Sequence, residues 1–260
     1  MSKKRHITII TPNYFPEDTA IGLYTTQFSR FLIKKGIDIT VLTGFPCYPQ
    51  WSIYENYKLL PNYFEETIDG LKIIRYKQYV PKEVTFKGRI KMMLSFFIGT
   101  FNNVFKIPKT DLVITIIPYT LSVVPSAFLA KRKKAKLWIH IQDFEFDLAL
   151  DSGILKKNSF FSKIFQKCIF LFEKKLLNRA NVVSSISFKM LEKIQVKSNQ
   201  KDPYYFPNWV SSEKINPNLF SQHRYISKDK FTLLYSGNIG EKQDWPFLKD
   251  LCKKFVGENT

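Results

Sequence analysis

The sequence predicts an α/β fold with a doubly wound parallel sheet, followed by the beginning of a second unit of the same kind. Short runs rich in β-branched residues alternate with segments of helical periodicity along most of the chain. Strands that alternate with helices form parallel sheets that helices cover on both faces. A further strand–turn–helix pattern begins near residue 231, after a polar stretch that contains prolines. We therefore predict a first domain at residues 1–215, a linker at 216–229 and the start of a second domain at 230–260.

In the first third of the chain, glycine and proline mark the ends of the elements. The β-branched run Ile7–Thr11 predicts a strand that a proline-containing loop closes. Apolar residues recur at helical spacing over Gly22–Lys35, and Gly36 is a typical helix stop. A strand, a proline-rich loop and another strand are then expected at residues 37–43, 44–61 and 71–76.

The middle of the chain continues this alternation of helix and strand. Helical periodicity leads into a β-branched run three times, and one more helix follows. The expected helices are 87–105, 120–130, 159–179 and 188–196, and the expected strands are 112–117, 137–141 and 181–187. The polar residues 198–229 include three prolines, which suits a linker. Another strand is expected at 231–235, with a helix beginning near Trp245.

The charge of the chain is strongly basic, with 40 Lys and Arg against 22 Asp and Glu and a formal net charge of +18. This charge has two interpretations. It reflects a composition that is generally rich in lysine, or it serves to attract an anionic membrane leaflet or a phosphorylated ligand. Few of the basic residues are arginine and no nucleic-acid recognition motif is present, so we expect no nucleic-acid partner. The three cysteines share no metal-ligand spacing, which favours a reduced, cytoplasmic setting without a metal.

The loop after the first strand, Asn13–Gly22, is the first candidate site. In open α/β sheets, ligands bind beyond the carboxyl ends of the strands, so this loop borders the expected cleft. We place Glu17, Gly22 and Tyr24 at the substrate. The loop holds a single glycine, so a dinucleotide fingerprint is not supported. The alternative is a plain turn in which Gly22 only opens a helix.

The second candidate site lies at the end of the strand 137–141. His140 is followed by Asp143, Glu145 and Asp147, which alternate with two phenylalanines. In extended backbone these carboxylates share one face, where they would bind sugar hydroxyls or supply one acid–base group. The alternatives are a hydrogen-bonded core histidine and an acidic helix N-terminus that suits the helix dipole.

Basic and aromatic residues interleave in two stretches, 82–109 and 159–179. Packing of two amphipathic helices on the sheet explains this pattern. The alternative is a basic amphipathic surface at a membrane interface. The most apolar stretch, Met92–Phe105, is too short to span a bilayer.

The third candidate site is the glycine-rich turn that follows the strand at 231–235. It carries Gly237, Asn238, Gly240 and Lys242 before the expected helix at Trp245. A strand, a glycine-rich turn and a helix direct backbone N–H groups and a helix dipole toward a phosphate. We therefore expect a phosphate group to bind there.

Six segments together resemble a known family, the GT-B retaining glycosyltransferases of family 4, and within it the colanic-acid-type fucosyltransferases of bacterial exopolysaccharide assembly. They occur in the same order along the chain, at Asn13–Gly22, Thr43–Pro49, His140–Glu145, Ser185–Ser187, Pro207–Trp209 and Tyr235–Gln243. The resemblance implies a GT-B fold with an acceptor-side Rossmann-like domain and a C-terminal nucleotide-sugar domain. It also implies metal-independent transfer of a sugar, with retention, to a lipid-linked saccharide. The donor would be a nucleotide sugar of the GDP-sugar type, and no other cofactor is expected.

The resemblance also implies roles for individual residues. Asp143 and His140 match the catalytic position at the end of the fifth strand, with Glu145 at the substrate. Lys242 matches the residue that meets the donor diphosphate, whereas Asn238 stands where many members have arginine, and Ala20 replaces a glycine common in the first loop.

In the family, a paired-glutamate motif and most of the donor domain would follow residue 260. We therefore expect a truncated enzyme that is weak or inactive alone, with a separately encoded C-terminal half as a possible partner. Its expected location is the cytoplasm, peripheral on the inner face of the cytoplasmic membrane. The alternative function is a non-catalytic module that binds an acceptor lipid or a membrane.

Overall fold

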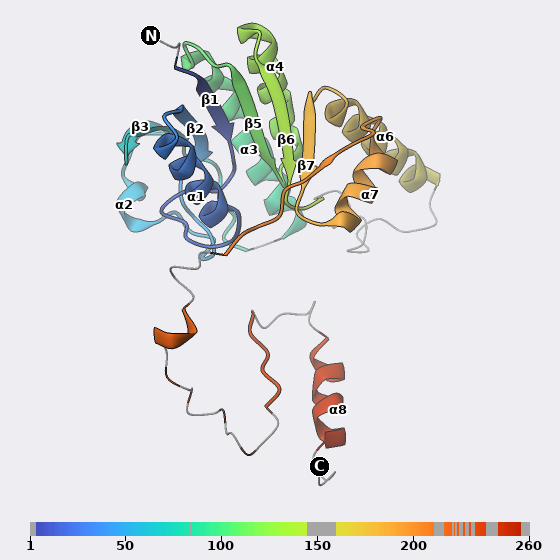
Figure 1. Cartoon of the computed structure of the whole chain (residues 1–260). Coiled ribbons are helices and arrows are strands. Elements are labelled where there is room, and N and C mark those ends of the chain that lie inside the picture. Colours follow the sequence, from blue (N-terminus) through green and yellow to red (C-terminus); the bar gives the residue numbers. More distant parts are fainter. Residues whose placement is uncertain are drawn as a thin grey trace. The chain divides into compact units, whose positions relative to one another are not determined.

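The computed structural model describes residues 4–83, 85–144, 160–210, 216–219, 221, 223, 226, 229, 232–237 and 244–255. The chain divides into two compact units, Met1–Trp209 and Val210–Thr260 (Figure 1). The first unit holds the sheet and the candidate cleft. The second unit contributes a 3₁₀ turn at Pro217–Leu219 and the helix α8 at Trp245–Phe255.

The first unit is built on one eight-stranded sheet with the strand order β3-β4-β2-β1-β5-β6-β7-β8. The sheet is parallel except at its edge, where β3 pairs antiparallel with β4. The strands are β1 His6–Ile10, β2 Asp38–Gly44, β3 Tyr63–Ile68, β4 Leu71–Tyr76, β5 Leu112–Ile117, β6 Lys136–Ile141, β7 Val182–Ser185 and β8 Tyr204–Tyr205. The predicted doubly wound α/β fold is confirmed by this order, which reverses between β1 and β5.

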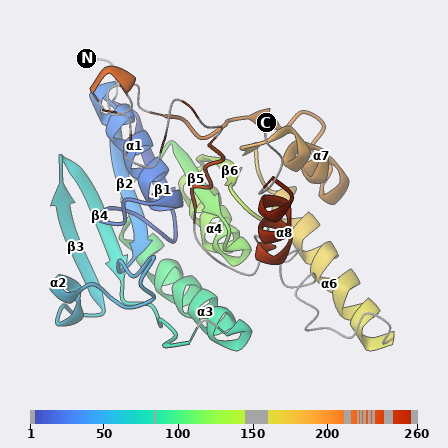
Figure 2. The same cartoon turned by 90° about the horizontal axis from the view of Figure 1, so that it is seen from below.

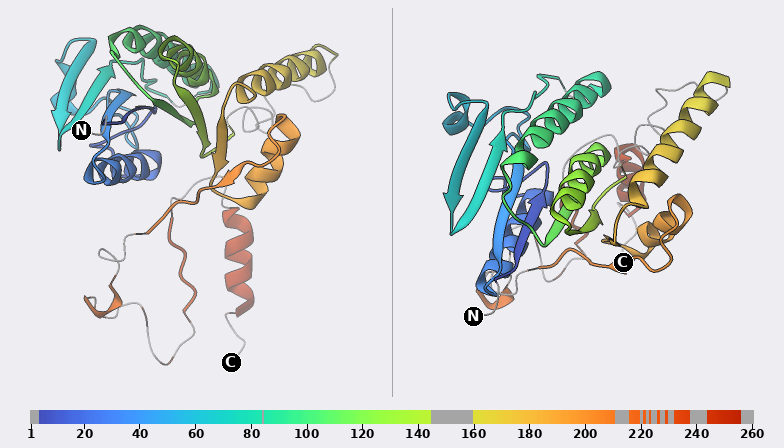
Figure 3. Two further views of the ribbon diagram at one scale, coloured as in Figure 1. Left: turned by 45° about the horizontal axis from the view of Figure 1, so that its top comes forward. Right: turned by 90° about the horizontal axis from the view of Figure 1, so that it is seen from above.

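Helices cover both faces of the sheet (Figures 2 and 3). α1 packs on one face, while α3, α4 and α6 form a layer on the other face, with α7 beside α6. The helices of this unit are α1 Ala20–Lys34, α2 Glu55–Lys58, α3 Phe86–Asn103, α4 Val123–Lys133, α6 Phe160–Leu177 and α7 Phe188–Lys197, with 3₁₀ turns at Val104–Lys106 and Thr120–Ser122. Within the described ranges, none of the helices combines the length and apolar character needed to cross a membrane.

The core lies on both sides of the sheet because successive side chains of a strand point to opposite faces. In β1, Ile9 belongs to the cluster under α1, and Ile10 belongs to the cluster under the α3–α4–α6 layer. The central strands are apolar on both faces, as expected for a parallel sheet buried between helices.

The strand β3 and the short helix α2 are absent from the sequence-based prediction. β3 joins β4 through Asp69 and Gly70, whose φ angles are +52° and +77°. An Asp-Gly pair with positive φ at both positions is the usual signal of a two-residue hairpin turn. The sheet is therefore not wholly parallel, and its β4 edge is closed by a hairpin.

Two further differences concern the region after α7. The stretch 198–229, interpreted as suiting a linker, is not all linker, since β8 pairs with β7 and the first compact unit extends to Trp209. The expected strand at 231–235 is wrong, because the described residues 232–236 form no strand. An isolated strand gains little without a neighbour to accept its backbone hydrogen bonds. The helix expected from Trp245 is confirmed as α8.

Candidate substrate-binding cleft

A cleft of about 260 Å³ lies at the carboxyl ends of β1, β2, β5 and β6. These four strands are neighbours in the sheet, and the cleft includes the point between β1 and β5 where the strand order reverses. Ligands of open α/β sheets bind at such a switch point. Its walls come from the first loop (Asn13, Thr19, Ala20, Ile21), the loop after β2 (Cys47, Tyr48, Trp51), α3 (Arg89, Met92) and the segments after β5 and β6 (Pro118, Tyr119, Asp143).

The buried carboxylate of Glu17 joins two walls of this cleft. Its Oε1 accepts hydrogen bonds from the backbone N–H groups of Cys47 and Tyr48, each at 2.7 Å, and its Oε2 accepts one from Tyr14 at 3.1 Å. Burial raises the pKa of Glu17, and these hydrogen bonds, with one from the Asn13 side chain, oppose the rise. Glu17 is 2% exposed, so its position lets it hold the two loops together.

Two more buried polar side chains support the same loops from β4 and the residues after it. The Arg75 guanidinium is fully buried, pairs with Glu66, and donates to the carbonyl oxygens of Gly44 and Phe15. Gln78 bonds Phe45 in both directions, accepting from its N–H at 2.7 Å and donating to its carbonyl at 2.9 Å. The cleft therefore rests on a polar framework, which fixes backbone positions more specifically than apolar packing does.

Gly22 lies in the first turn of α1, directly against the loop that leads into it. A Cβ at this position would lie 2.5 Å from the carbonyl oxygen of Glu17, a contact that no side chain tolerates without backbone movement. The close approach of loop and helix therefore requires glycine at this position. Gly22 itself does not line the cleft.

Asp143 lies in the cleft, directly after β6. Its Oδ1 accepts the backbone N–H of Phe144 at 2.8 Å, and its carboxylate shares the cleft with the first loop and Tyr119. On the α3 side, the Arg89 guanidinium carbon lies over the ring of Trp51, 5.5 Å from the ring centroid. The cleft thus combines an acidic group, a basic group and aromatic faces, a set that suits a polar ligand with apolar ring faces such as a sugar.

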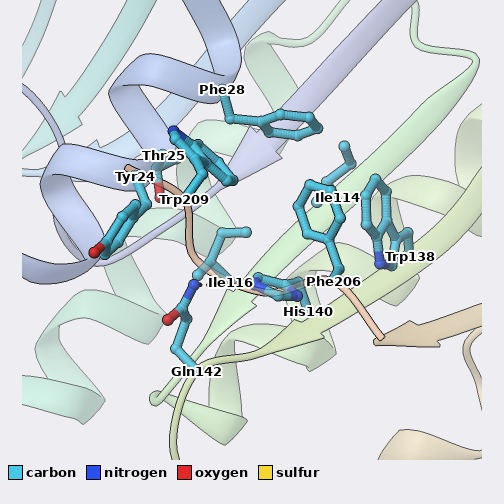
Figure 4. Close-up of a pocket in the computed structure, with 10 residues that line it drawn as sticks. All are labelled: Tyr24, Thr25, Phe28, Ile114, Ile116, Trp138, His140, Gln142, Phe206 and Trp209. Atoms are coloured by element: carbon cyan, nitrogen blue, oxygen red, sulfur yellow. Dashed lines mark hydrogen bonds between the residues drawn. The ribbon is translucent and has the colours of Figure 1, made fainter. Parts of the chain in front are cut away.

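His140 does not line this cleft but lies in a small aromatic cavity on the α1 side of the sheet (Figure 4). The cavity has a volume of about 10 Å³, enough for no more than one water molecule. Its walls include Tyr24 and Phe28 of α1, and Phe206 and Trp209 of the segment that follows β8. Tyr24 contacts Trp209 edge-to-face, with ring centroids 5.5 Å apart, so it packs in this aromatic cluster.

Both ring nitrogens of His140 have hydrogen-bond partners. The Gln142 amide donates to Nε2 at 2.9 Å, so the neutral ring carries its proton on Nδ1 and donates to Ser184 Oγ at 2.9 Å. Gln142 and Asn208 exchange two further amide hydrogen bonds, at 2.9 and 3.1 Å. Burial lowers the pKa of His140 to about 4, which keeps the ring neutral near pH 7. Of the two catalytic candidates, only Asp143 lies in the larger cleft.

The remaining predicted site residues lie elsewhere. Glu145, Asn238, Gly240 and Lys242 fall outside the described residues. Gly237 belongs to the second unit. Over the part of the chain that the structure describes, no three His, Cys, Asp or Glu side chains gather where they could hold a metal ion.

Sequence reasoning did not single out several residues that line the cleft, namely Trp51, Arg89, Met92 and Tyr119. Trp51 belongs to a loop that was described only as proline-rich. Arg89 belongs to the stretch 82–109, which was interpreted only by its general basic and aromatic character. Trp51 and Tyr119 have a topological signal, because they follow β2 and β5, the two parallel strands on either side of β1, whose carboxyl ends lie at the same edge of the sheet.

No protein-family model matches the chain. The chain is similar to a protein of Escherichia coli (strain K12) named "Putative colanic acid biosynthesis glycosyl transferase WcaI", with 32% identity over 240 residues. The matched region is 89% of this chain and 58% of WcaI, so the chain spans little more than half of that relative.

Two solved structures resemble the fold at low identity. A sucrose-phosphate synthase structure from Thermosynechococcus elongatus has 15% identity and a TM-score of 0.46, covering 81% of this chain and 92% of that one. Arabidopsis thaliana UGT89C1, in complex with UDP-L-rhamnose, has 11% identity and a TM-score of 0.42, covering 74% and 44%. Neither score is high enough to assign a fold family, so the fold class rests on the sheet topology itself.

Proposed function

We propose that this chain is the acceptor-side part of a GT-B glycosyltransferase. The observation that carries the proposal is the 32% identity to WcaI over 240 residues, which covers 89% of this chain. The cleft agrees with this function, since it lies at the switch point of the sheet and offers a carboxylate beside aromatic side chains.

The finer assignments rest on the motif resemblance. We propose transfer with retention, as in family 4, from a nucleotide sugar of the GDP-sugar type, with fucose as the first sugar to test. The acceptor is a lipid-linked saccharide of exopolysaccharide assembly, and the enzyme works in the cytoplasm at the inner face of the membrane. No metal or further cofactor takes part.

Asp143 is the proposed acid–base group, because its carboxylate lies in the cleft beside the first loop. Tyr48 and Trp51 would pack against a sugar ring, and Arg89 would meet an anionic group of the acceptor. Glu17 and Gly22 keep the walls in place, and His140 orients Gln142 at the edge of the aromatic cavity. Glu145 is proposed to hold sugar hydroxyls. Gly237, Asn238, Gly240 and Lys242 would meet the donor diphosphate.

Donor binding is proposed to require residues that correspond to the remaining part of WcaI. We expect the 260-residue chain to transfer sugar weakly or not at all by itself, because stabilising the departing diphosphate needs donor-side groups.

The test joins this chain to the C-terminal part of WcaI and measures transfer from labelled GDP-fucose, and from other nucleotide sugars, to a bacterial lipid fraction. Asp143→Asn keeps the shape of the side chain but removes its charge. If Asp143 does acid–base work, this change lowers turnover by about 100-fold or more. Asp18→Asn is the matched control, since Asp18 is exposed on the same first loop and does not line the cleft.

A folded, active chimera in which Asp143→Asn turns over like the parent would contradict the assigned role. A folded chimera that transfers no sugar from any donor would instead support the second candidate, a non-catalytic module that binds an acceptor lipid or a membrane. The exposed apolar side chains of α3 are the observation that favours that second candidate.

A further inference from the structure

The outward side of α3 is apolar where a helix on a protein surface is normally polar. Ile90, Leu94 and Ile98 follow one another at four-residue spacing and are 37%, 45% and 54% exposed. Phe86 continues the same row toward the start of the helix, and its side chain is also exposed. The opposite side of α3 is buried on the sheet through Met93 and Phe96 and neighbouring small residues.

A second row of aromatic side chains extends this surface beyond the end of α3. Phe97 and Phe101 are half-buried, and Phe105 after the helix is exposed. Phe101 and Phe105 both contact Phe128 of α4, with ring centroids 5.2 and 5.5 Å apart. We call the combined set the α3 surface; it consists of Phe86, Ile90, Leu94, Phe97, Ile98, Phe101, Phe105 and Phe128.

Basic side chains accompany the α3 surface, and acidic ones are nearly missing from that part of the sequence. Between residues 84 and 142 the chain has ten Lys and Arg but a single acidic residue, Asp111. Lys87 and Lys91 are exposed and each follows a member of the row Phe86, Ile90, Leu94 and Ile98 by one residue. The Arg132 guanidinium carbon lies 5.0 Å from the Phe105 ring centroid. An apolar strip with a basic surround is complementary to a bilayer that has an apolar interior and an anionic surface.

We infer that the α3 surface docks on an anionic lipid bilayer. The aliphatic and phenylalanine side chains would enter the interface between headgroups and acyl chains, and the lysines would contact the lipid phosphates. A purely electrostatic partner such as a nucleic acid would use the basic residues but would leave the apolar rows without a role.

Docking of this kind would also place the candidate cleft near the lipid. Arg89 and Met92 line the cleft from α3, so the same helix carries the cleft on one side and the apolar surface on another. An acceptor whose lipid part lies in the bilayer could then present its headgroup to Arg89. This step deepens the proposed function by naming the surface that meets the acceptor's membrane, but the docking itself needs no sugar chemistry.

The experiment is co-sedimentation of the full chain with vesicles of phosphatidylcholine, with and without about one-third phosphatidylglycerol. We expect binding to the anionic vesicles that weakens as salt is raised from about 0.05 to 0.5 M, because the basic residues are screened. The double variant Leu94→Glu/Ile98→Glu should reduce partitioning about tenfold or more.

The matched control is Leu59→Glu/Val196→Glu, which makes the same change in charge. Leu59 and Val196 are 98% and 73% exposed and lie outside the α3 surface. This control should bind as the parent does, apart from a small loss from its charge. Circular dichroism and the urea midpoint establish that both double variants are folded.

Three results would overturn the inference. They are equal loss in both double variants, equal binding of the parent to neutral and anionic vesicles, and absence of vesicle binding. Light scattering adds a fourth, since a dimer that Leu94→Glu/Ile98→Glu converts to a monomer would assign the surface to a second copy of the chain. The assay contains no sugar donor, so a chain that binds vesicles but transfers no sugar fails only the proposed function.

Discussion

The Oε1 atom of Glu17 lies 2.7 Å from the backbone nitrogen of Cys47, and this contact ties the loop after β1 to the loop after β2. Tyr48 donates to the same oxygen at the same distance. Both loops line the candidate cleft, so one buried carboxylate fixes the separation of two of its walls. A carboxylate suits this position because it accepts several N–H groups and donates none.

Glu17→Gln should therefore destabilise the first unit, although the two side chains have nearly the same size. The glutamine amide has one oxygen where the carboxylate has two. Its NH₂ group would therefore face at least one of the backbone N–H groups that now donate to Glu17. Leaving a buried donor without its acceptor costs about 1–3 kcal/mol. Urea unfolding followed by circular dichroism measures the loss.

The control for this prediction is Asp18→Asn, at the next residue of the same loop. Asp18 is exposed, so the control should change the free energy of unfolding by less than about 0.5 kcal/mol. An equal effect of the two substitutions would mean that the Glu17 hydrogen bonds do not stabilise the loops.

The thiol of Cys47 should react far more slowly than the other two thiols. Burial and the nearby Glu17 carboxylate raise the pKa of Cys47 to about 12, whereas Cys168 and Cys252 are exposed. The reactive species is the thiolate, so Ellman's reagent at pH 8 should count two fast thiols in the folded chain and three in denaturant. Glu17→Gln should speed the third thiol, because it removes the negative charge that raises this pKa. Three fast thiols in the folded parent would show that the β2 loop opens readily.

His140 should make the protein less stable as the pH falls from about 6.5 to about 4. Burial lowers the pKa of His140 to about 4 in the folded state, against 6.5 for the unfolded chain. Above pH 6.5 both states are neutral and there is no cost. Below pH 6.5 the histidine of the unfolded state is protonated while His140 in the folded state stays neutral down to about pH 4, so the free energy of unfolding falls by up to about 3 kcal/mol. Urea unfolding at several pH values measures this slope.

His140→Asn separates this effect from the titration of the carboxyl groups. Its free energy of unfolding will be lower at pH 7, because the bonds to Ser184 and Gln142 change, but it lacks the histidine's own slope. The difference between parent and variant should therefore shrink by about 3 kcal/mol between pH 7 and pH 4. A constant difference over this range would show that His140 titrates normally.

The alternation of strands and helices could be predicted because the spacing of apolar residues within each short segment indicates which kind of element it forms. The strand at 112–117 and the helix at 188–196 were placed to within one residue. β3 was missed because its alternating exposed and half-buried residues give no continuous apolar run. Only the Asp69-Gly70 turn indicated it. The prediction of a strand at 231–235 was wrong for the opposite reason. Its sequence has a continuous apolar run, but pairing with a neighbouring strand decides whether a strand forms.

The candidate site was predictable only as a location. Topology places the loop at residues 13–22 and Asp143 at the same edge of the sheet, and the structure brings Asp143 and this loop together. The contacts of Glu17 with Cys47, and the enclosure of His140 by Phe206, depend on residues distant in sequence. No local pattern reports such contacts, so they emerge only with the tertiary structure.

The buried pair of Arg75 and Glu66 should be strongly coupled, in contrast to the exposed pair of Arg30 and Asp69. Arg75 is fully buried and Glu66 is 18% exposed, whereas the side chains of Arg30 and Asp69 are 39% and 55% exposed. Exposed pairs are screened by water and contribute less than about 1 kcal/mol. Removing one partner of a buried pair costs about 3–5 kcal/mol, because the remaining charge is left without compensation.

A double-mutant cycle on each pair measures the difference. In the first cycle, Arg75→Met and Glu66→Gln are made singly and together, and urea unfolding gives a coupling energy that we expect to exceed about 1.5 kcal/mol. The second cycle, with Arg30→Met and Asp69→Asn, should give less than about 0.5 kcal/mol. Arg75→Met alone should cost more than Glu66→Gln, because Arg75 also donates to the carbonyls of Gly44 and Phe15. Equal coupling in both cycles would mean that Arg75 stabilises the loops through those carbonyls and that its ion pair contributes no more than a surface pair.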